Sequence, residues 1–214
     1  MENSVISVKN VTKKYKEYTV VNDVSLTVEK GDIVGLIGRN GSGKTVLMKM
    51  ICGLVAPTSG EISVNGKIIG KNVDIPNDIG VIIETPGFLP NFSAYNNLIQ
   101  LAKINRKIDS TEVKNAIKKV GLNPDDKKHV GKFSLGMRQR LGLAQAIMED
   151  PDLLILDEPM NGLDKDGVED IRELLLQLKA DGKTMIIASH NSMDIEVLCD
   201  KVFEITKGEL KQVR

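Results

Sequence analysis

The chain of 214 residues is long enough for one large domain, or for one domain with an additional lobe. Its composition is 41% hydrophobic, enough for a sizeable core, and its 29 basic residues equal its 29 acidic residues. A net charge of zero argues against an extended nucleic-acid surface, so no nucleic acid partner is expected. Cys52 and Cys199 lie far apart without a Cys-x-x-Cys pair, which favours reduced core thiols over a disulfide or a zinc site.

No segment is typical of secretion or of membrane insertion. The first residues, Met1–Val5, contain neither a basic stretch nor a long apolar run, so no signal peptide is expected. The longest apolar runs, such as Leu153–Leu156, have the length of a strand and fall far short of the roughly 20 residues that span a bilayer as a helix. We therefore expect a soluble chain that, at a membrane, relies on another chain for the spanning segments.

Two runs near the N-terminus, Val5–Val8 and Val24–Val28, alternate apolar and polar residues. Such alternation predicts half-exposed antiparallel strands. Tyr15 lies between the two runs, and its local pattern leaves two interpretations open. It is either an edge-strand residue with no role, or a flat ring on which adenine stacks.

The segment Gly38-Arg39-Asn40-Gly41-Ser42-Gly43-Lys44-Thr45 matches the phosphate-binding pattern Gly-x-x-x-x-Gly-Lys-Thr. The apolar run before it predicts a buried strand, and the run that starts at Val46 predicts a helix. Glycines let the backbone approach an anion closely, so that N–H groups and the helix N-terminus point at phosphate oxygens. Lys44 is then expected to reach the β- and γ-phosphates, and Thr45 to place its hydroxyl on Mg²⁺. The alternative is a glycine-rich turn with a chance lysine, which the two flanking elements disfavour.

Turn residues separate two further predicted strands in the next part of the chain. Glu61–Val64 alternates as a strand and is followed by Asn65-Gly66, a hairpin signal. Asp78–Ile83 predicts another strand, and the proline and glycine of Glu84–Gly87 end it. The composition then becomes helical. We expect a helical lobe over approximately residues 89–150, inserted within one domain that covers residues 1–214.

The second half of the chain predicts apolar strands that alternate with helices. Ser134 is placed to cap the helix that follows it. The predicted elements after that helix are the strand Leu153–Leu156, the helix Ile171–Leu178, the strand Thr184–Ala188, and two edge strands at Val202–Ile205 and Glu209–Leu210. This alternation indicates a mainly parallel α/β sheet.

Several motifs stand in a fixed order along the chain. They are the phosphate-binding loop, Glu84 after a strand, Ser134-Leu135-Gly136-Met137-Arg138-Gln139, the strand-end pair Asp157-Glu158, Asn161-Gly162-Leu163-Asp164, and His190 after a strand. This order resembles the ATP-binding subunit of ABC transporters over essentially the whole chain. The serine–glycine segment that leads into an apolar strand with Asp-Glu is the most specific part. A GTPase would contain Asn-Lys-x-Asp, which the sequence lacks.

The resemblance implies a fold: a P-loop NTPase core with a mainly parallel sheet, an N-terminal antiparallel β subdomain and an inserted helical lobe. It also implies roles for single residues. Tyr15 stands where the family places its adenine-stacking aromatic ring. Asp157 resembles the carboxylate that holds Mg²⁺ through water, and Glu158 the general base that orients the attacking water. His190 resembles the switch histidine that contacts the γ-phosphate, although a lone histidine is more often structural. ATP and Mg²⁺ are the expected cofactors.

Ser134 and Gly136 are expected to act on a second subunit. In the family these residues close over the nucleotide that the other subunit holds, so two half-sites share two ATP molecules in a head-to-tail dimer. The resemblance places Asp164 at the seam. The second subunit is either a copy of this chain or a paralogous ATPase. Ser134 can also be a plain helix cap, and both interpretations can hold at once.

The sequence departs from the common family pattern in three ways. It contains Ser-Leu-Gly-Met where most members have Ser-Gly-Gly-Gln, and Glu84 stands where most have glutamine. It also ends soon after its last predicted strands, without an accessory C-terminal domain. The first two features resemble the bacitracin- and lantibiotic-type export subfamily. Because a carboxylate replaces an amide, we expect Glu84 to stay close to Mg²⁺ and to couple its position to the membrane partner.

The expected function is therefore that of a Mg²⁺-dependent ATPase subunit. It would power the export of a peptide antibiotic or another drug through separate transmembrane permease subunits, from the cytoplasmic face of the membrane. Two alternatives stay open: a non-transport ABC ATPase that acts on ribosomes or DNA, and an importer subunit. The cargo is chosen by the transmembrane chains, so this sequence does not specify it.

Overall fold

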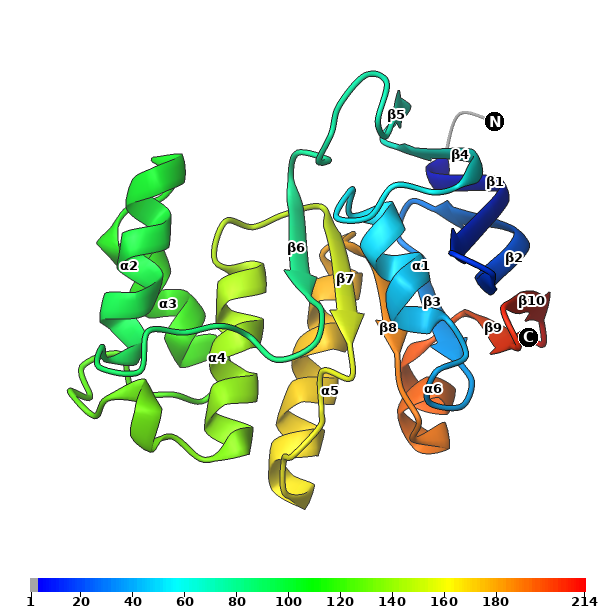
Figure 1. The fold of residues 1–214 in the computed structure, drawn as a ribbon. Helices are drawn as coiled ribbons and strands as arrows, with labels where there is room; N and C mark the ends of the chain where they lie inside the picture. Colours follow the sequence, from blue (N-terminus) through cyan, green and yellow to red (C-terminus); the bar gives the residue numbers. More distant parts are fainter. Residues whose placement is uncertain (1–3) are drawn as a thin grey trace.

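The computed structural model describes residues 4–214. The expectation that no signal peptide is present concerns Met1–Val5, of which residues 1–3 lie outside the described residues. The described part contains two sheets, with a group of helices to one side of them (Figure 1). The first sheet has the strand order β2-β1-β4-β5, and the second has the order β10-β9-β3-β8-β7-β6.

The first sheet is antiparallel and contains the strands β1 (Ser4–Tyr15), β2 (Tyr18–Glu29), β4 (Ser59–Val64) and β5 (Lys67–Ile68). The two alternating runs of the sequence are parts of β1 and β2, so the predicted antiparallel pair is confirmed. The hairpin predicted at Asn65-Gly66 is confirmed as well. It joins β4 to β5, with φ of +49° at Asn65 and +74° at Gly66. Positive φ at both central residues is typical of a two-residue hairpin turn.

The second sheet is mainly parallel and contains the strands β3 (Ile33–Ile37), β6 (Ile79–Ile82), β7 (Leu153–Asp157), β8 (Thr184–Ala188), β9 (Lys201–Thr206) and β10 (Glu209–Gln212). Only β10 among its described strands runs antiparallel to its neighbour, which is β9. The predicted α/β class with a mainly parallel sheet and an antiparallel β subdomain is therefore confirmed.

One strand prediction was wrong. The segment Val202–Ile205 was expected to be an edge strand, but β9 lies inside the sheet between β10 and β3. The physical reason is that both faces of β9 are covered, since the adjacent residues Val202 and Phe203 are both buried. Consecutive buried residues are typical of a strand inside a parallel sheet, whereas strict alternation marks a strand with one exposed face.

The helices are α1 (Lys44–Ile51), α2 (Ala94–Asn105), α3 (Ser110–Lys119), α4 (Leu135–Ile147), α5 (Lys165–Ala180) and α6 (Ser192–Leu198), with a short 3₁₀ turn at Val130–Lys132. Ser134 is the N-cap of α4, and its Oγ accepts a hydrogen bond from the N–H of Met137 over 3.1 Å, as predicted. Helices α2 and α3 form the helical group beyond β6 (Figure 1). None of the helices in residues 4–214 is long and apolar enough to cross a membrane.

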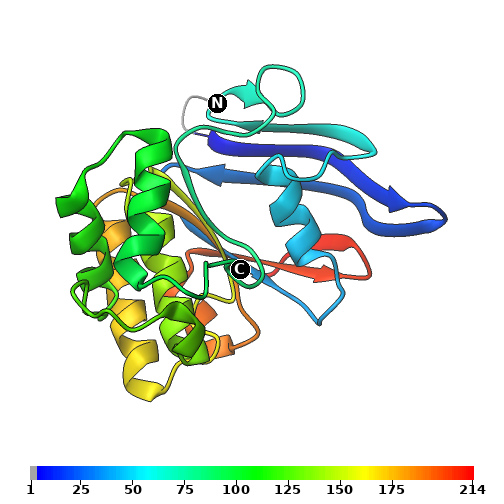
Figure 2. The ribbon, with the colours of Figure 1, turned by 60° about the vertical axis from the view of Figure 1, so that its left-hand side comes forward.

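The parallel sheet is buried on both faces, and successive residues of β7 pack into different clusters. Leu153 and Ile155 pack with α1 and the antiparallel sheet, whereas Leu154 and Leu156 pack with α2 to α6. Helix α1 is thereby enclosed between the two sheets. Figure 2 shows α1 beneath the antiparallel strands, with the helical group on the opposite side of the molecule. Burying α1 in this way fixes the loop that precedes it.

Both cysteines are free and buried, as the sequence predicted. Cys52 follows α1 and Cys199 follows α6. Burial raises the pKa of each thiol to about 12. Because the thiolate is the reactive form, both side chains behave as small apolar core residues at neutral pH.

Candidate nucleotide-binding site

The phosphate-binding loop begins where β3 ends and leads directly into α1, so the predicted order of strand, loop and helix is confirmed. Two of its glycines have backbone conformations that other residues rarely adopt, with φ of +144° at Gly38 and +113° at Gly43. A Cβ at Gly38 would lie 2.3 Å from the carbonyl oxygen of Ile205, and one at Gly43 would lie 2.7 Å from that of Val20. These glycines are therefore required for the loop to pass so close to neighbouring backbone.

Two side chains of the loop are arranged for an anion. Lys44 is only 7% exposed, and its Nζ donates to the carbonyl oxygens of Gly38 and Arg39 over 2.7 and 3.3 Å. The Oγ of Ser42 is buried and has no hydrogen-bond partner in the described structure. An unsatisfied buried hydroxyl is costly, and a phosphate oxygen held by the loop would satisfy it. The residues present therefore fit a nucleotide phosphate.

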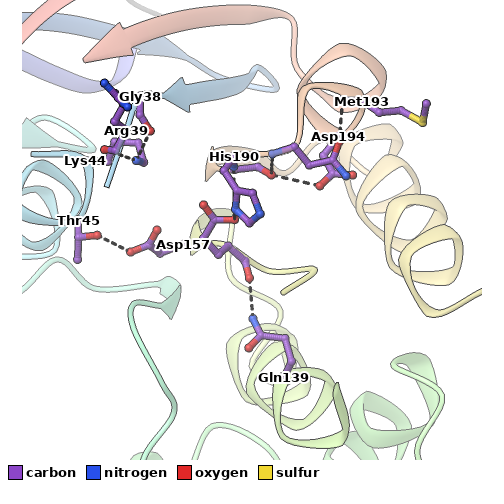
Figure 3. Close-up of polar contacts among 12 residues, drawn as sticks. Gly38, Arg39, Lys44, Thr45, Gln139, Asp157, His190, Met193 and Asp194 are labelled. Carbon is purple, nitrogen blue, oxygen red and sulfur yellow. Dashed lines mark hydrogen bonds and ion pairs between the residues drawn. The ribbon is translucent and has the colours of Figure 1, made fainter. Parts of the chain in front are cut away.

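Strand β8 lies between β3 and β7 and aligns the ends of all three. Its last residue, Ala188, is level with Leu36 of β3 and with Asp157 of β7. Loops at the carboxyl ends of neighbouring parallel strands meet at one edge of the sheet, where ligands bind in open α/β folds. There the Oγ1 of Thr45 donates to Oδ2 of Asp157 over 2.7 Å (Figure 3). A hydroxyl and a carboxylate are oxygen donors of the kind that Mg²⁺ prefers.

Glu158 is held by three neighbouring elements. It follows β7 with a left-handed backbone, φ +51°, and its N–H donates to the carbonyl oxygen of Ala188 over 2.9 Å. Gln139 of α4 donates through Nε2 to the Glu158 carbonyl oxygen over 3.0 Å. The Glu158 carboxylate Oε2 lies 2.8 Å from Nδ1 of His190. Asp157 therefore faces Thr45 while Glu158 faces His190, so the two adjacent carboxylates point in different directions.

The bond between His190 and Glu158 determines which ring nitrogen carries a proton. An ionised carboxylate only accepts hydrogen bonds, so Nδ1 of His190 must be the donor. This leaves Nε2 for a further partner. The His190 side chain is 69% exposed, so a ligand can reach it from solvent. His190 thus contacts Glu158, the predicted general base, through Nδ1 and can contact a bound ligand through Nε2.

A cleft of about 350 Å³ brings many of the predicted residues together. It is lined by Asn40–Val46, which includes Lys44 and Thr45, together with Glu84, Asp157 and Glu158. Gly38, Arg39 and His190 line a neighbouring hollow of about 630 Å³. The phosphate loop, the predicted metal residues and the predicted base therefore surround one region.

Tyr15 lies at the end of β1, apart from the residues that line the cleft, and is 48% exposed. The Nζ of Lys13 lies 4.8 Å from the centre of its ring and also donates to the carbonyl oxygen of Ala56 over 2.7 Å. One face of the ring is thus covered by a cation, which leaves the other face for stacking.

Ser134, Gly136 and Asp164 lie where α4 and α5 begin, and they do not line the cleft themselves, although Leu135 between Ser134 and Gly136 does. Asp164 caps α5, with Oδ1 accepting from the N–H of Gly167 over 3.0 Å. A Cβ at Gly136 would lie 2.8 Å from the carbonyl oxygen of Gly162. The two helix N-termini are therefore packed against each other, which suits a surface that faces an anion.

Leu135 explains how the chain accommodates Ser-Leu-Gly-Met in this segment. Its side chain lies over Gly162, where an added Cβ would come within 2.5 Å of Leu135 Cδ2. Leu135 nevertheless remains 47% exposed. Its exposed part lines the cleft beside the phosphate loop.

Glu84 forms an ion pair with Lys49, which was not predicted as a site residue. Its carboxylate Oε1 lies 2.6 Å from Nζ of Lys49 on α1. The Glu84 backbone is left-handed, with φ of +60°, and its side chain is 65% exposed. Glu84 lines the same cleft as Thr45 and Asp157, so its expected role near a metal stays a prediction.

Gln139 was not predicted as a site residue, although it belongs to the motif Ser134–Gln139. The available signal was a polar residue on the buried face of a helix, since Gln139 is 8% exposed among apolar neighbours of α4. Val20, Arg138 and Asn161 also line the cleft and were not predicted. Arg138 and Asn161 belong to motifs quoted above, whereas no local pattern marks Val20, which reaches the cleft only through the tertiary fold.

A glycine loop between a parallel strand and a helix, with an acidic pair at the end of another strand of the same sheet, defines a P-loop nucleotide-binding protein. The family model described as "ABC transporter" matches residues 21–161. The chain therefore belongs to the ABC transporter family, as an ATP-binding and ATP-hydrolysing member.

Curated relatives extend over nearly the whole chain. An uncharacterized ABC transporter ATP-binding protein, YybJ of Bacillus subtilis (strain 168), is 45% identical over 97% of this chain and 95% of its own length. The bacitracin transport ATP-binding protein BcrA of Enterococcus faecalis is 45% identical over 96% of this chain and 68% of its own length. The lantibiotic transport ATP-binding protein SrtF of Streptococcus pyogenes is 40% identical, over 96% and 89% respectively.

Solved structures agree with the fold. The dimeric structure of a bacterial ABC transporter cassette has a TM-score of 0.86 and 26% identity, over 98% of this chain and 99% of that chain. A dimeric post-hydrolysis state of an ATP-binding cassette, bound to ADP and Pi, has a TM-score of 0.87 and 24% identity, over 98% and 99%. The predicted architecture of an ABC ATPase is therefore confirmed.

Proposed function

We propose that this chain is the Mg²⁺-dependent ATPase subunit of an ABC exporter that moves a peptide antibiotic or a related drug. The observation that carries the reaction is the arrangement at the ends of β3, β7 and β8. There the Glu158 carboxylate lies 2.8 Å from His190, and Thr45 bonds to Asp157 beside the phosphate-binding loop. A base, a metal site and an anion-binding loop are the parts that phosphoryl transfer to water requires.

The loop residues Gly38 to Val46 hold the nucleotide phosphates in this proposal, and Lys44 bonds to the terminal ones. Lys44 exchanges its bonds to Gly38 and Arg39 for phosphate oxygens. Thr45 and Asp157 would hold Mg²⁺ through their hydroxyl and carboxylate oxygens, and Glu84 lines the same cleft. Bound Mg²⁺ offsets the negative charge that builds on the phosphoryl oxygens. Tyr15 stacks on the adenine ring with the face that Lys13 leaves open.

Glu158 is the general base in this mechanism. Its carboxylate orients a water molecule toward the terminal phosphate and accepts a proton from it. His190 keeps Glu158 in place through Nδ1 and presents Nε2 to the γ-phosphate. Gln139 of α4 bonds to the backbone carbonyl of Glu158, and this bond holds the backbone that carries the carboxylate in place. These residues thus supply mostly positioning and charge stabilisation, as expected for this class of reaction.

The complete site requires a second subunit, either a copy of this chain or a paralogue. Ser134 and Gly136 stand at the N-terminus of α4 and do not line the cleft of their own chain, which Leu135 between them reaches. In a head-to-tail dimer they close over the nucleotide of the partner subunit, with Asp164 at the seam. The dimeric cassette structure supports this arrangement, since it shares the fold over nearly the whole chain.

The membrane part of the transporter is supplied by separate permease chains in this proposal. The ATPase then sits on the cytoplasmic face of the membrane as a peripheral subunit. The bacitracin and lantibiotic transport relatives support peptide antibiotics as the class of cargo. Glu84 and the Ser-Leu-Gly-Met segment, which suggested that subfamily from the sequence, support the same cargo class.

The test is an affinity purification from detergent-solubilised membranes of the native cell, with the Glu158→Gln form and ATP. We expect a polytopic membrane protein to be recovered, because the variant holds the ATP-bound state. The same purification with Lys44→Ala serves as the control, since that variant loses the nucleotide. Recovery of ribosomal or DNA-bound proteins in place of a permease would contradict the transport role.

A further inference from the structure

A buried ion pair joins α5 to α6 behind the turn that carries His190. Arg172 of α5 is 6% exposed, and Asp194 of α6 is 3% exposed. Both Nε and Nη2 of Arg172 donate to Oδ1 of Asp194, over 3.0 and 2.5 Å. The remaining Nη1 donates to Glu169 over 2.8 Å at the surface. The guanidinium thus occupies one oxygen of the Asp194 carboxylate and leaves Oδ2 for another partner.

The second oxygen of Asp194 holds the turn before His190. Ser189 is 3% exposed, and its Oγ donates to Oδ2 of Asp194 over 3.1 Å (Figure 3). The same Oγ accepts from the N–H of Asn191 over 3.1 Å. Asn191 in turn caps α6 by accepting from the N–H of Met193 over 3.0 Å. The residues on both sides of His190 are therefore fixed to α6, and through Asp194 to α5.

His190 depends on this turn for its own position. Its ring is largely exposed, and the side-chain hydrogen bond that it makes is the one to Glu158. Its backbone N–H also lies 3.4 Å from the same Glu158 oxygen. Because no packed neighbour encloses the ring, the backbone of the turn decides where both nitrogens point. Whatever fixes Ser189 therefore also fixes the hydrogen-bond donors that hold the Glu158 carboxylate.

We propose that Arg172, Asp194 and Ser189 form a positioning relay for hydrolysis. Arg172 keeps the Asp194 carboxylate oriented, Asp194 holds Ser189, and Ser189 sets the turn whose His190 orients Glu158. Stability alone gives little reason for such a pair, because well-packed apolar residues in place of a buried ion pair often leave a fold equally stable or more stable. The inference rests on the proposed function, since it takes Glu158 to be the base.

The relay also reaches the expected seam between subunits. Arg172 stands eight residues after Asp164, the N-cap of α5, which is about 12 Å along the helix axis. A second subunit that contacts Asp164 therefore touches the same rigid helix that carries Arg172. Its docking is then transmitted through α5 to Asp194, and from there to His190 and Glu158.

The test compares two variants of the full chain that remove the relay in different ways. Ser189→Ala deletes the bond to Asp194 with little change in volume. The double variant Arg172→Met, Asp194→Leu replaces the ion pair by apolar side chains and keeps the interior filled. For both we expect kcat of ATP hydrolysis to fall about tenfold, with the ATP dissociation constant from a fluorescent-nucleotide titration unchanged within about twofold. The melting temperature of each variant is measured in parallel.

Glu169→Gln is the matched control, because it removes the outer partner of Arg172 and leaves Asp194 untouched. We expect wild-type kcat for this variant. Wild-type kcat in Ser189→Ala, or in the folded double variant, would overturn the relay. So would an equal loss of kcat in Glu169→Gln. The proposed function is rejected by a different result, namely that Glu158→Gln retains turnover. If Glu158→Gln loses turnover while the relay variants keep wild-type kcat, only the relay is rejected.

Discussion

Glu158 is the residue on which the rate of hydrolysis should depend most. Replacing Glu158 with Gln keeps the shape of the side chain and its bond to His190 but removes the group that accepts a proton. We expect kcat to fall at least about a hundredfold, since general base catalysis contributes about that much or more. The affinity for ATP should be retained. Phosphate release gives kcat, and a fluorescent-ATP titration gives the affinity.

A matched control for this variant is Glu173→Gln, which changes an exposed glutamate of α5 in the same way. It should leave both quantities at wild-type values. Steady-state hydrolysis that persists in Glu158→Gln would reject Glu158 as the base. Loss of ATP binding in the same variant would show that the carboxylate acts earlier than the chemical step.

Glu84 is a second residue whose charge can be tested. We expect Glu84→Gln to raise the Mg²⁺ concentration that gives half of the maximal ATPase rate by up to about fivefold, because an exposed charge contributes up to about 1 kcal/mol. The measurement is a Mg²⁺ titration of the ATPase rate at fixed ATP. Lys49→Gln serves as the comparison, since it removes the partner 2.6 Å away and leaves the carboxylate in place. Identical Mg²⁺ dependence in wild type and Glu84→Gln would exclude the metal role.

The structural surroundings of single residues were predicted well where a continuous motif contains them. The phosphate-binding loop needed only its own residues and the strand and helix beside it. Gln139 and Lys49 were not predicted as site residues because their partners, Glu158 and Glu84, lie far along the chain. A side chain that acts by a tertiary contact leaves no spacing to recognise. Local sequence patterns therefore predict the residues expected to bind ligand. The residues that position those side chains become visible only in the folded structure.

At the scale of elements, α4 packs directly against the loop after β6. A Cβ at Gly142 of α4 would lie 2.7 Å from Cγ of Pro86. Pro86 stands two residues after Glu84, so the helix that begins at Ser134 packs directly on the loop that carries Glu84. The absence of a side chain at Gly142 is what permits this contact.

The substitution Gly142→Ala tests that contact. The added methyl group must displace Pro86, and overpacking of this kind costs about 1–3 kcal/mol. The better helix propensity of alanine offsets about 1 kcal/mol of that cost. We expect a net loss of about 1 kcal/mol in the free energy of unfolding, taken as the overpacking cost less the propensity gain. Urea denaturation measures it.

Gly87→Ala is the control in the same loop, since nothing lies within 4 Å of an added Cβ there. That variant should match or slightly exceed wild-type stability, because alanine restricts the unfolded chain. Equal stability of the two variants would mean that Pro86 moves aside freely. The loop and α4 would then not move as one unit.

Strand pairing was predictable from the sequence only where the paired strands are adjacent in the chain. The alternation in β1 and β2, and the turn at Asn65-Gly66, predicted their hairpins because the partners are adjacent in sequence. The interior position of β9 was not predicted, because its parallel neighbour β3 lies near the other end of the chain. Pairing between distant strands depends on the whole topology, so a short apolar segment near the C-terminus resembled an edge strand.

At the scale of the whole molecule, the exposed N-terminus of α4 predicts how two subunits meet. With ATP and Glu158→Gln we expect a stable dimer in sedimentation velocity, since hydrolysis no longer opens it. Adding Leu135→Glu should abolish that dimer, because a charge would be buried at the seam without a partner. Because Leu135 also lines the cleft, a fluorescent-ATP titration of the same variant must show that ATP binding is retained. Ile104→Glu is the matched control. Ile104 is 75% exposed but lies at the far end of α2, away from the seam.

A dimer that survives Leu135→Glu would place the seam elsewhere. Loss of the dimer in Ile104→Glu would instead implicate the helical group in the contact between subunits. Both variants change an exposed apolar residue to glutamate, so a general effect of the added charge on solubility would affect them equally.

The strand order of the parallel sheet also governs when the protein can begin to function during its synthesis. Strands β3 and β7 do not pair with each other, because β8 lies between them. Ile33 pairs with Met185, and Leu153 pairs with Thr184. A nascent chain that has not yet produced β8 therefore lacks the strand whose backbone hydrogen bonds connect the strand before the phosphate loop to the strand that ends in Asp157. We therefore expect ATP hydrolysis to begin only after residues 184–188 have been synthesised and have paired with both strands.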